Sequence, residues 1–208
     1  MADHAYDRDF WERLWARTLD EHGDRVARRA PSGHLTSLVD DLPPGLALDA
    51  GCGHGSEALW LAARGWEVTA VDFSAAALAQ GRKMAVAAGP EIAARIGWIE
   101  ADLAAWTPEP ARYELVASIY VHIAGSVEEA VGRLAAAVAP GGALLLVGHQ
   151  PIDPATGAPT AAAGQVQVSV ETARSLLDPA HWDLPVAEER VRDGGSGVDA
   201  VVFARRLS

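Results

Sequence analysis

Short apolar runs alternate with longer stretches of helical periodicity along most of this chain. Apolar or alternating runs predict five strands, at residues 46–50, 67–72, 96–100, 114–119 and 143–149. Apolar positions at helical spacing predict three helices between them, at residues 56–64, 75–88 and 127–138. Ser74 and Ser126 stand directly before the second and third of these helices, where N-cap residues are expected.

Strands that alternate with helices predict a doubly wound α/β fold. A short helix near residues 170–177 and two further strands, near 184–191 and 198–206, complete the pattern. We therefore expect a Rossmann-like, mostly parallel, seven-stranded sheet with helices on both faces and a final antiparallel strand. The strand at 143–149 is apolar throughout, as is typical of a buried parallel strand.

Two regions lie outside this alternation. Near the N-terminus an aromatic helix has an apolar stripe of Phe10, Trp11, Leu14 and Trp15, and a second helix is expected after Ser32. Residues 150–167 have no periodicity and many turn formers. Loops of this length are uncommon in compact domains and often functional, so we expect this loop and the aromatic helix to close over a ligand.

Composition narrows the class of protein. Half of the 208 residues are apolar, which supports one full domain, and the formal charge of -11 disfavours nucleic acid as a partner. The single cysteine excludes an internal disulfide. The chain has no run of about 18 apolar residues and no signal-peptide pattern at its N-terminus, so we expect a cytoplasmic protein that does not bind membranes.

The strongest local signal is the segment LALDAGCGHGSE at residues 46–57, which follows a predicted strand and opens a predicted helix. Gly51, Gly53 and Gly55 allow a tight turn and a close approach of the backbone to a ligand. Asp72 ends the next strand, 21 residues after Gly51, where a carboxylate can accept hydrogen bonds from a ribose diol. The pattern therefore predicts a ligand that contains a nucleoside.

The residues around this loop favour one nucleoside ligand over a dinucleotide. The third glycine comes one residue earlier than in the dinucleotide pattern, and Ser56 stands where that pattern has glycine. Asp49 precedes the loop, and its carboxylate would repel a pyrophosphate but attract an α-ammonium group. S-adenosylmethionine, with adenosine at one end and an amino acid at the other, suits both Asp49 and Asp72.

These motifs resemble those of class I S-adenosylmethionine-dependent methyltransferases, over roughly residues 45–149. LDAGCGHG, VTAVDFS, IEADLAAW, YELVASIYVHI and LAAAVAPGGALLLVGH follow one another in the family's order and spacing. The segment GSEALWLAARGWEVTAVDFS is similar to the small tellurite-resistance and thiopurine methyltransferases. The resemblance implies a single methyltransferase domain over residues 1–208, with an N-terminal helical cap at 1–44, a cofactor-binding core at 45–149, and a substrate loop with the C-terminal strands at 150–208.

The resemblance also assigns residues to the cofactor. It implies a ribose contact for Asp72, a contact of Asp102 with the adenine amino group and of Leu103 with its ring, and a roof over the site from Trp11 or Arg13. The cofactor-binding residues expected on this basis are Asp49, Gly51, Cys52, Gly53, Gly55, Asp72, Phe73, Asp102, Leu103, Ser118 and Trp11. Asp102 could instead cap a turn, and Cys52 could be only a small buried side chain.

Three histidines and a tyrosine are the candidates for the acceptor side. His122 and His149 each follow a strand at the ligand-binding edge and could accept a proton near neutral pH, although a histidine in such a place could equally bond only to the backbone. Tyr120 is the expected aromatic wall of the acceptor pocket. His54 is expected to point to solvent or to the ligand's carboxylate. His149, Asp153 and His122 do not assemble a carboxylate-rich site, so no metal is expected.

The sequence thus predicts an S-adenosylmethionine-dependent methyltransferase that transfers a methyl group to an oxygen, nitrogen or sulfur atom of a small molecule by direct displacement. Two alternatives remain at this point. One is an NAD(P)-dependent oxidoreductase on the same kind of sheet, and the other is a non-catalytic module that only binds S-adenosylmethionine. The expected partners are a small-molecule acceptor and, at most, a second copy of the chain, since a monomer or a homodimer is expected.

Overall fold

A computed structural model describes residues 8–122, 125–152, 156–159, 167–191 and 197–208. Its strands belong to a seven-stranded sheet with the order β3-β2-β1-β4-β5-β7-β6. The chain divides into two compact units, residues 1–106 and 107–208. The predicted α/β sheet, mostly parallel with an antiparallel final strand, is confirmed.

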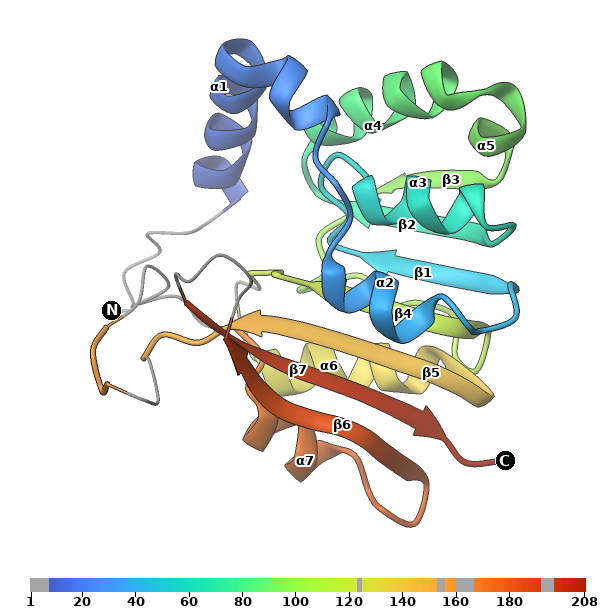
Figure 1. The fold of residues 1–208 in the computed structure, drawn as a ribbon, viewed down its shortest axis with the longest axis vertical. Helices are drawn as coiled ribbons and strands as arrows, with labels where there is room; N and C mark the ends of the chain where they lie inside the picture. Colours follow the sequence, from blue (N-terminus) through green and yellow to red (C-terminus); the bar gives the residue numbers. More distant parts are fainter. Residues whose placement is uncertain (1–7, 123–124, 153–155, 160–166, 192–196) are drawn as a thin grey trace. The chain divides into compact units, whose positions relative to one another are not determined.

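The first unit holds three parallel strands, which lie side by side in Figure 1. They are β1 (Leu46–Ala50), β2 (Glu67–Asp72) and β3 (Ile96–Glu100). Its helices are α1 (Arg8–Ala27), α2 (Gly33–Val39), α3 (Ser56–Ala63), α4 (Ala75–Ala88) and α5 (Pro90–Ala94). The in-register pairing of β1 with β2 brings the carboxyl ends of these strands together at one edge.

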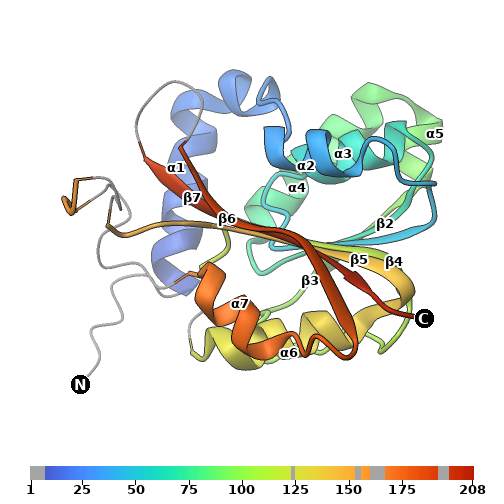
Figure 2. The ribbon, with the colours of Figure 1, turned by 60° about the horizontal axis from the view of Figure 1, so that its bottom comes forward.

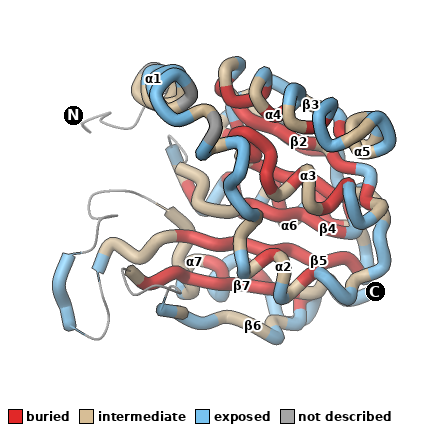
Figure 3. The backbone as a smooth tube through the Cα atoms, turned by 45° about the horizontal axis from the view of Figure 1, so that its top comes forward, coloured by how far each residue is buried: buried red, intermediate tan, exposed pale blue. Residues whose placement is uncertain are grey.

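In the second unit, β4 (Tyr113–Ile119) pairs in parallel with β5 (Val138–His149). The last strand, β7 (Val198–Arg206), runs antiparallel to β5 and to β6 (Trp182–Val191). Figure 2 shows α6 (Val127–Ala137) and α7 (Val170–Leu176) on the same side of these strands. β5 and β7 are buried along most of their length, as the red tube in Figure 3 shows, whereas β6 is mostly exposed.

The largest differences from the sequence prediction are the start of one strand and one additional helix. β5 begins at Val138 and passes through Pro140, Gly141 and Gly142, because an irregular register opposite the start of β4 accommodates the turn formers within the strand. The short helix α5 was not predicted, although Pro90 directly after Gly89 is a typical start signal. No helix among the described residues is long and apolar enough to cross a membrane.

Helix caps set several of the predicted elements. Ser74 accepts a hydrogen bond from the Ala77 N–H at 3.2 Å, and Ser126 accepts one from the Glu129 N–H at 3.1 Å. Both serines lie where the sequence placed them, and each satisfies a donor that the first turn of the helix leaves open. The caps also fix where α4 and α6 begin after the carboxyl ends of β2 and β4.

Candidate active site

The loop from Gly51 to Gly55 joins the end of β1 to the start of α3. Three of its glycines have left-handed backbone angles, with φ of 81°, 53° and 80° at Gly51, Gly53 and Gly55. Side chains with a Cβ rarely adopt this conformation. The N–H groups of Gly51 and Cys52 donate to the Val71 carbonyl oxygen at 2.8 and 2.9 Å, which ties the loop to β2.

The carboxylate of Asp72 lies directly beneath this loop. Its Oδ2 accepts a hydrogen bond from the Gly53 N–H at 2.8 Å, and its Oδ1 accepts one from the Ser74 N–H at 2.9 Å. Burial raises the pKa of Asp72, and the two backbone donors oppose that rise. Each oxygen keeps a lone pair that an additional donor, such as a ribose hydroxyl, could use.

Asp49 is a buried carboxylate with an unused acceptor. It belongs to β1, its side chain is 2% exposed, and its Oδ2 has no hydrogen-bond partner among the described residues. Burial is the largest cause that holds its pKa well above the usual range, and the charges of Glu57 and Asp72 raise it further. A cationic donor beside Oδ2 would relieve both effects, so this site suits an ammonium group.

Glu57 completes the acidic surroundings of the loop, and the sequence analysis did not select it. Its Oε1 accepts from the Ser32 N–H at 3.0 Å, and its Oε2 accepts from the Ser56 hydroxyl at 2.6 Å. The sequence feature that could have indicated Glu57 is its place in the first turn of α3. An acidic residue is favourable at that place in any helix, so the feature does not single out a ligand site. Its contact with Ser32 also fixes the segment that enters α2.

His54 corrects one expectation. The side chain is 3% exposed, so it does not point to solvent, and its Nε2 has no partner among the described residues. Its ring centroid lies 5.6 Å from that of Trp15. Burial lowers the pKa of His54, and the charge of Arg29 lowers it further. A loop histidine of this kind therefore packs as a neutral ring.

Cys52 is a small buried side chain, as one of its two interpretations expected. Burial, with the negative charges of Asp49 and Asp72, holds the pKa of its thiol well above the usual range. The thiolate is the reactive form of cysteine, so this residue has no nucleophilic character here.

Helix α1 contacts the glycine loop through Trp15 and the start of α4 through Glu12. A Cβ on Gly53 would lie 2.9 Å from the Trp15 ring, so this indole rests on the loop. Glu12 accepts from the Ser74 hydroxyl at 3.0 Å and from the Ala75 N–H at 3.1 Å, which fastens α1 to the N-terminus of α4. Trp11, the residue selected from the sequence, is in edge-to-face contact with Phe10, with ring centroids 5.4 Å apart.

Trp98 explains two of the glycines in this unit. Its ring lies where a Cβ on Gly55 or on Gly81 would stand, and Gly81 is also close to the His54 carbonyl oxygen. The third glycine of the loop therefore has a packing reason of its own, apart from any ligand. Because Gly55 and Gly81 lack a Cβ, the loop and α4 can approach the Trp98 ring of β3 closely.

The residues that follow β2 and β3 differ in how far they are buried. Asp102 is exposed, and its Oδ1 accepts from the Ala104 N–H at 2.8 Å, so it caps a turn as the alternative interpretation expected. Leu103 is buried, and Phe73 is half-buried. The cap leaves Asp102 accessible, and the assignment of all three to an adenine pocket stays a prediction.

The second unit brings Tyr120 and His149 together, both of them selected from the sequence. Their rings are stacked, with centroids 4.0 Å apart and an interplanar angle of 20°. Asp199 of β7, which the sequence analysis missed, contacts both of these side chains. Ser118 is buried within β4 and paired in register with Leu146 of β5.

His122 lies in the same unit, near Gln167. The Gln167 amide nitrogen is 3.1 Å from Nε2 of His122 and 3.5 Å from Nδ1. Burial, with the charge of His149, lowers the pKa of His122 to about 4. His122 is therefore a neutral ring at physiological pH.

The described residues contain no group of three histidine, cysteine, aspartate or glutamate side chains placed to hold a metal ion. Asp153 lies outside the described residues, as do residues 160–166 of the predicted substrate loop.

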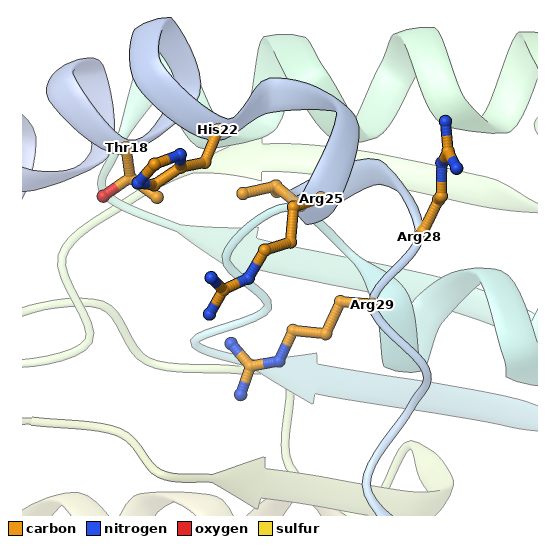
Figure 4. A pocket seen from close by; sticks show the side chains of 6 residues that line it. Thr18, His22, Arg25, Arg28 and Arg29 are labelled. Carbon is orange, nitrogen blue, oxygen red and sulfur yellow. The ribbon is translucent and has the colours of Figure 1, made fainter.

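A basic hollow opens beside the C-terminal half of α1 and the segment that follows it. Its volume is about 750 Å³, and it is lined by Thr18, His22, Arg25, Val26, Arg28 and Arg29. The guanidinium groups of Arg25 and Arg29 point into the same space, whereas Arg28 points away from them (Figure 4). Arg25, Arg28 and Arg29 form no ion pair with any carboxylate whose side chain the structure describes. The hollow therefore offers paired cations to an anionic group.

Comparison with known proteins gives this geometry a context. Residues 47–142 match the family model for a methyltransferase domain. A trans-aconitate 2-methyltransferase of Methylobacterium radiotolerans is 31% identical over 190 residues, which cover 85% of this chain and 68% of that protein. The enzyme of the same name from Paracidovorax citrulli is 35% identical over 137 residues, 64% of this chain and 47% of that protein. The match therefore spans about half of the second relative's length.

A solved structure shares the fold. The 1,6-didemethyltoxoflavin-N1-methyltransferase of Burkholderia thailandensis, solved with 1,6-didemethyltoxoflavin and S-adenosylhomocysteine, aligns with a TM-score of 0.70. The alignment covers 100% of this chain and 92% of that chain at 18% identity. Similarity at this level of identity concerns the fold alone.

Proposed function

This chain belongs to the S-adenosylmethionine-dependent methyltransferase family, and from that premise we propose that it transfers a methyl group from S-adenosylmethionine to a small molecule. The observation that carries the proposal is the unused, buried Oδ2 of Asp49 beside a glycine loop and a second buried carboxylate. S-adenosylmethionine supplies an electrophilic methyl group on a positively charged sulfur when it is bound.

Most of the residues that would hold this donor belong to the first unit, whereas Ser118 belongs to the second. Asp49 would accept from the α-ammonium group, and Asp72 would accept from the ribose hydroxyls. Gly51, Cys52, Gly53 and Gly55 would present backbone to the amino-acid end. Phe73, Asp102 and Leu103 would surround the adenine, and Trp11 and Ser118 are further candidates for contact with the donor.

The residues around the donor would act mainly by aligning the reacting groups, because the donor itself needs no proton transfer. A sulfonium needs little help to leave, so a catalyst gains most by orienting the acceptor, the methyl group and the sulfur and by excluding water. Such orientation contributes about 7–11 kcal/mol in favourable cases. Trp15, which covers Gly53, is placed to keep water from the loop.

Calorimetry of the full chain with S-adenosylhomocysteine, and separately with NADH, tests the donor assignment. We expect S-adenosylhomocysteine to bind and NADH not to bind, because Asp49 repels a pyrophosphate. Binding of NADH alone would support an NAD(P)-dependent oxidoreductase instead. Binding of S-adenosylhomocysteine without methyl transfer from labelled S-adenosylmethionine to any acceptor of a broad panel would support a non-catalytic module.

For the acceptor, we propose that the basic hollow of Arg25 and Arg29 takes a carboxylate. Two relatives are named for trans-aconitate, a small carboxylic acid, which supports this choice. The planar guanidinium group binds carboxylates in a bidentate manner, and two such groups that point into one space suit an anion.

Removal of both arginines from the hollow tests this assignment. We expect Arg25→Gln with Arg29→Gln to raise the Kd for trans-aconitate at least tenfold, since hydrogen bonds to a charged group contribute about 1.5–3 kcal/mol each. The matched control is Arg82→Gln with Lys83→Gln, which removes two positive charges from exposed positions of α4 that do not line the hollow and should leave the Kd unchanged. Equal effects of this control and of the variant in the hollow would indicate general electrostatics and contradict a carboxylate site.

A further inference from the structure

Two histidine–aspartate pairs among the described residues of the second unit differ in burial. His181 lies 3.5 Å from the Asp178 carboxylate, and their side chains are 74% and 61% exposed. His149 lies 3.0 Å from the Asp199 carboxylate, with side chains 23% and 0% exposed. An exposed pair is screened by water and contributes little, whereas a buried carboxylate needs its partners. The buried pair is therefore the one that requires an explanation.

The strand register makes the buried pair. His149 is the last residue of β5 and stands directly opposite Asp199 of β7 in the antiparallel ladder. β7 is otherwise apolar from Ala200 to Phe203, so Asp199 is an acid within a buried strand. Tyr120 follows the carboxyl end of β4, next to β5. All three residues thus lie at the edge of the sheet where α/β proteins bind ligands.

Both oxygens of Asp199 have a hydrogen-bond partner. The Tyr120 hydroxyl donates to Oδ2 at 2.7 Å, and His149 Nδ1 lies 3.0 Å from Oδ1. Two hydrogen bonds stabilise the ionised form of a buried carboxylate, and an ionised carboxylate can only accept. The hydrogen of a neutral His149 ring is therefore on Nδ1. Nε2 then carries a lone pair and has no hydrogen-bond partner among the described residues.

Tyr120 is held in an uncommon conformation at this point. Its φ is 58°, in the left-handed region, and its N–H donates to the Val147 carbonyl oxygen at 2.8 Å. Such a conformation is strained for a residue with a Cβ and persists where the surroundings impose it, frequently at active sites. Here it allows the tyrosine ring to stack on His149 while the hydroxyl reaches Asp199.

We infer that His149 is the proton acceptor for the methyl acceptor, that Asp199 and Tyr120 are its positioning residues, and that the acceptor atom is an oxygen or nitrogen that carries a proton at neutral pH. The inference rests on the proposed function. A carboxylate acceptor needs no base, because it is already ionised, whereas a phenol, alcohol or ring N–H does.

The step balances as follows. A lone pair of the acceptor oxygen or nitrogen forms the bond to the methyl carbon, and the carbon–sulfur bond breaks with its electron pair left on sulfur. The acceptor's proton passes to Nε2 of His149, and the imidazolium that results is stabilised by the Asp199 carboxylate until the proton leaves to water.

His122 is the other histidine selected from the sequence, and it suits this role less well. Its ring lies against the Gln167 amide, with 3.1 Å between the amide nitrogen and Nε2. Its pKa of about 4 makes it a weak base. The side-chain oxygen of Gln167 also accepts from the backbone N–H of His149 at 2.8 Å, so Gln167 contacts both histidine residues.

Nitrogen-15 NMR of the histidine-labelled full chain tests the arrangement without any substrate. In the neutral ring we expect the hydrogen of His149 on Nδ1, assigned by the signal that His149→Gln removes. Asp199→Val removes the acceptor and should shift the hydrogen toward Nε2, and Asp199→Asn gives a conservative second variant if the first does not fold. A wild-type His149 with its hydrogen on Nε2, or no change in either Asp199 variant, would overturn the inference.

Methyl transfer from labelled S-adenosylmethionine gives a second readout. With 4-hydroxybenzoate, we expect His149→Gln to lower kcat by about 10²–10⁴-fold with little change in KM. His181→Gln, from the exposed pair, is the matched control and should retain wild-type kcat. Transfer confined to trans-aconitate, or equal kcat for both variants, would contradict a proton acceptor at His149.

Failure of this inference is distinguishable from failure of the proposed function. If S-adenosylhomocysteine does not bind, the proposed function fails, whatever the state of His149. If S-adenosylhomocysteine binds and the hydrogen of His149 is on Nε2, the proposed function stands and only the assignment of the proton acceptor is lost.

Discussion

Asp72→Ala will raise the Kd for S-adenosylhomocysteine by about a hundredfold or more. The variant loses two proposed hydrogen bonds to the ribose diol, each worth about 1.5–3 kcal/mol, and 1.4 kcal/mol corresponds to a tenfold change. It also leaves the Gly53 and Ser74 N–H groups without their acceptor, so the free energy of unfolding should fall as well. Calorimetry and thermal unfolding measure the two effects separately.

Two further variants separate the ligand contact from the structural one. Asp72→Asn keeps one acceptor oxygen and should lose less affinity than Asp72→Ala. Glu67→Ala removes a carboxylate from the other end of the same strand, where it pairs with Arg95 at 2.7 Å, and should leave the Kd unchanged. Equal affinity for S-adenosylhomocysteine and its 2′-deoxy analogue in wild type would contradict the ribose assignment.

Asp49→Asn is expected to change ligand binding and protein stability in opposite directions. Without the charge that would meet the ammonium group, the Kd for S-adenosylhomocysteine should rise about 10–100-fold. The ligand-free protein should become more stable by about 0.5–2 kcal/mol, because a buried carboxylate with an unpartnered oxygen is replaced by a neutral amide of the same shape.

The pH dependence of that gain has a definite sign. The pKa of Asp49 is raised in the folded protein, so folding favours its neutral form. Stability from this group is complete below the unfolded value of about 3.9 and is lost as the pH rises through the folded pKa. The advantage of Asp49→Asn should therefore be greatest near pH 8 and disappear toward pH 4. A gain in the free energy of unfolding that is constant between pH 4 and pH 8 would contradict a charged Asp49 that destabilises the folded protein.

Local patterns were sufficient for most of the fold. The periods of apolar residues predict the strands and the three main helices, because a strand buries alternate or all positions and a helix buries one face. The glycine loop and Asp72 could likewise be selected because their chemistry depends on spacing along one βαβ unit. The start of β5 could not, since Pro140 and the two glycines after it remain in the strand through a pairing irregularity with β4.

The residues that sequence reasoning missed depend on non-local partners. Asp199 reaches His149 only through the antiparallel register of β7, 50 residues away along the chain. Glu12 reaches the start of α4 across 62 residues. His54 reads as a polar loop residue, but the ring of Trp15 from α1 covers the loop and buries it. Such contacts follow from how elements pack, which no single segment encodes.

The ring of Trp98 leaves no space for a Cβ at position 55 or at position 81, so it constrains both positions to glycine. A glycine within a helix costs roughly 0.5–1 kcal/mol relative to alanine, so position 81 of α4 would drift to alanine if space allowed. A Cβ there would lie 2.5 Å from the Trp98 ring, and drift is blocked for as long as the tryptophan remains. A Cβ there would also lie 2.9 Å from the His54 backbone carbonyl oxygen, so a smaller residue at position 98 would not by itself admit alanine. Related chains with a side chain at position 81 should therefore have both a smaller residue at position 98 and a shifted glycine loop.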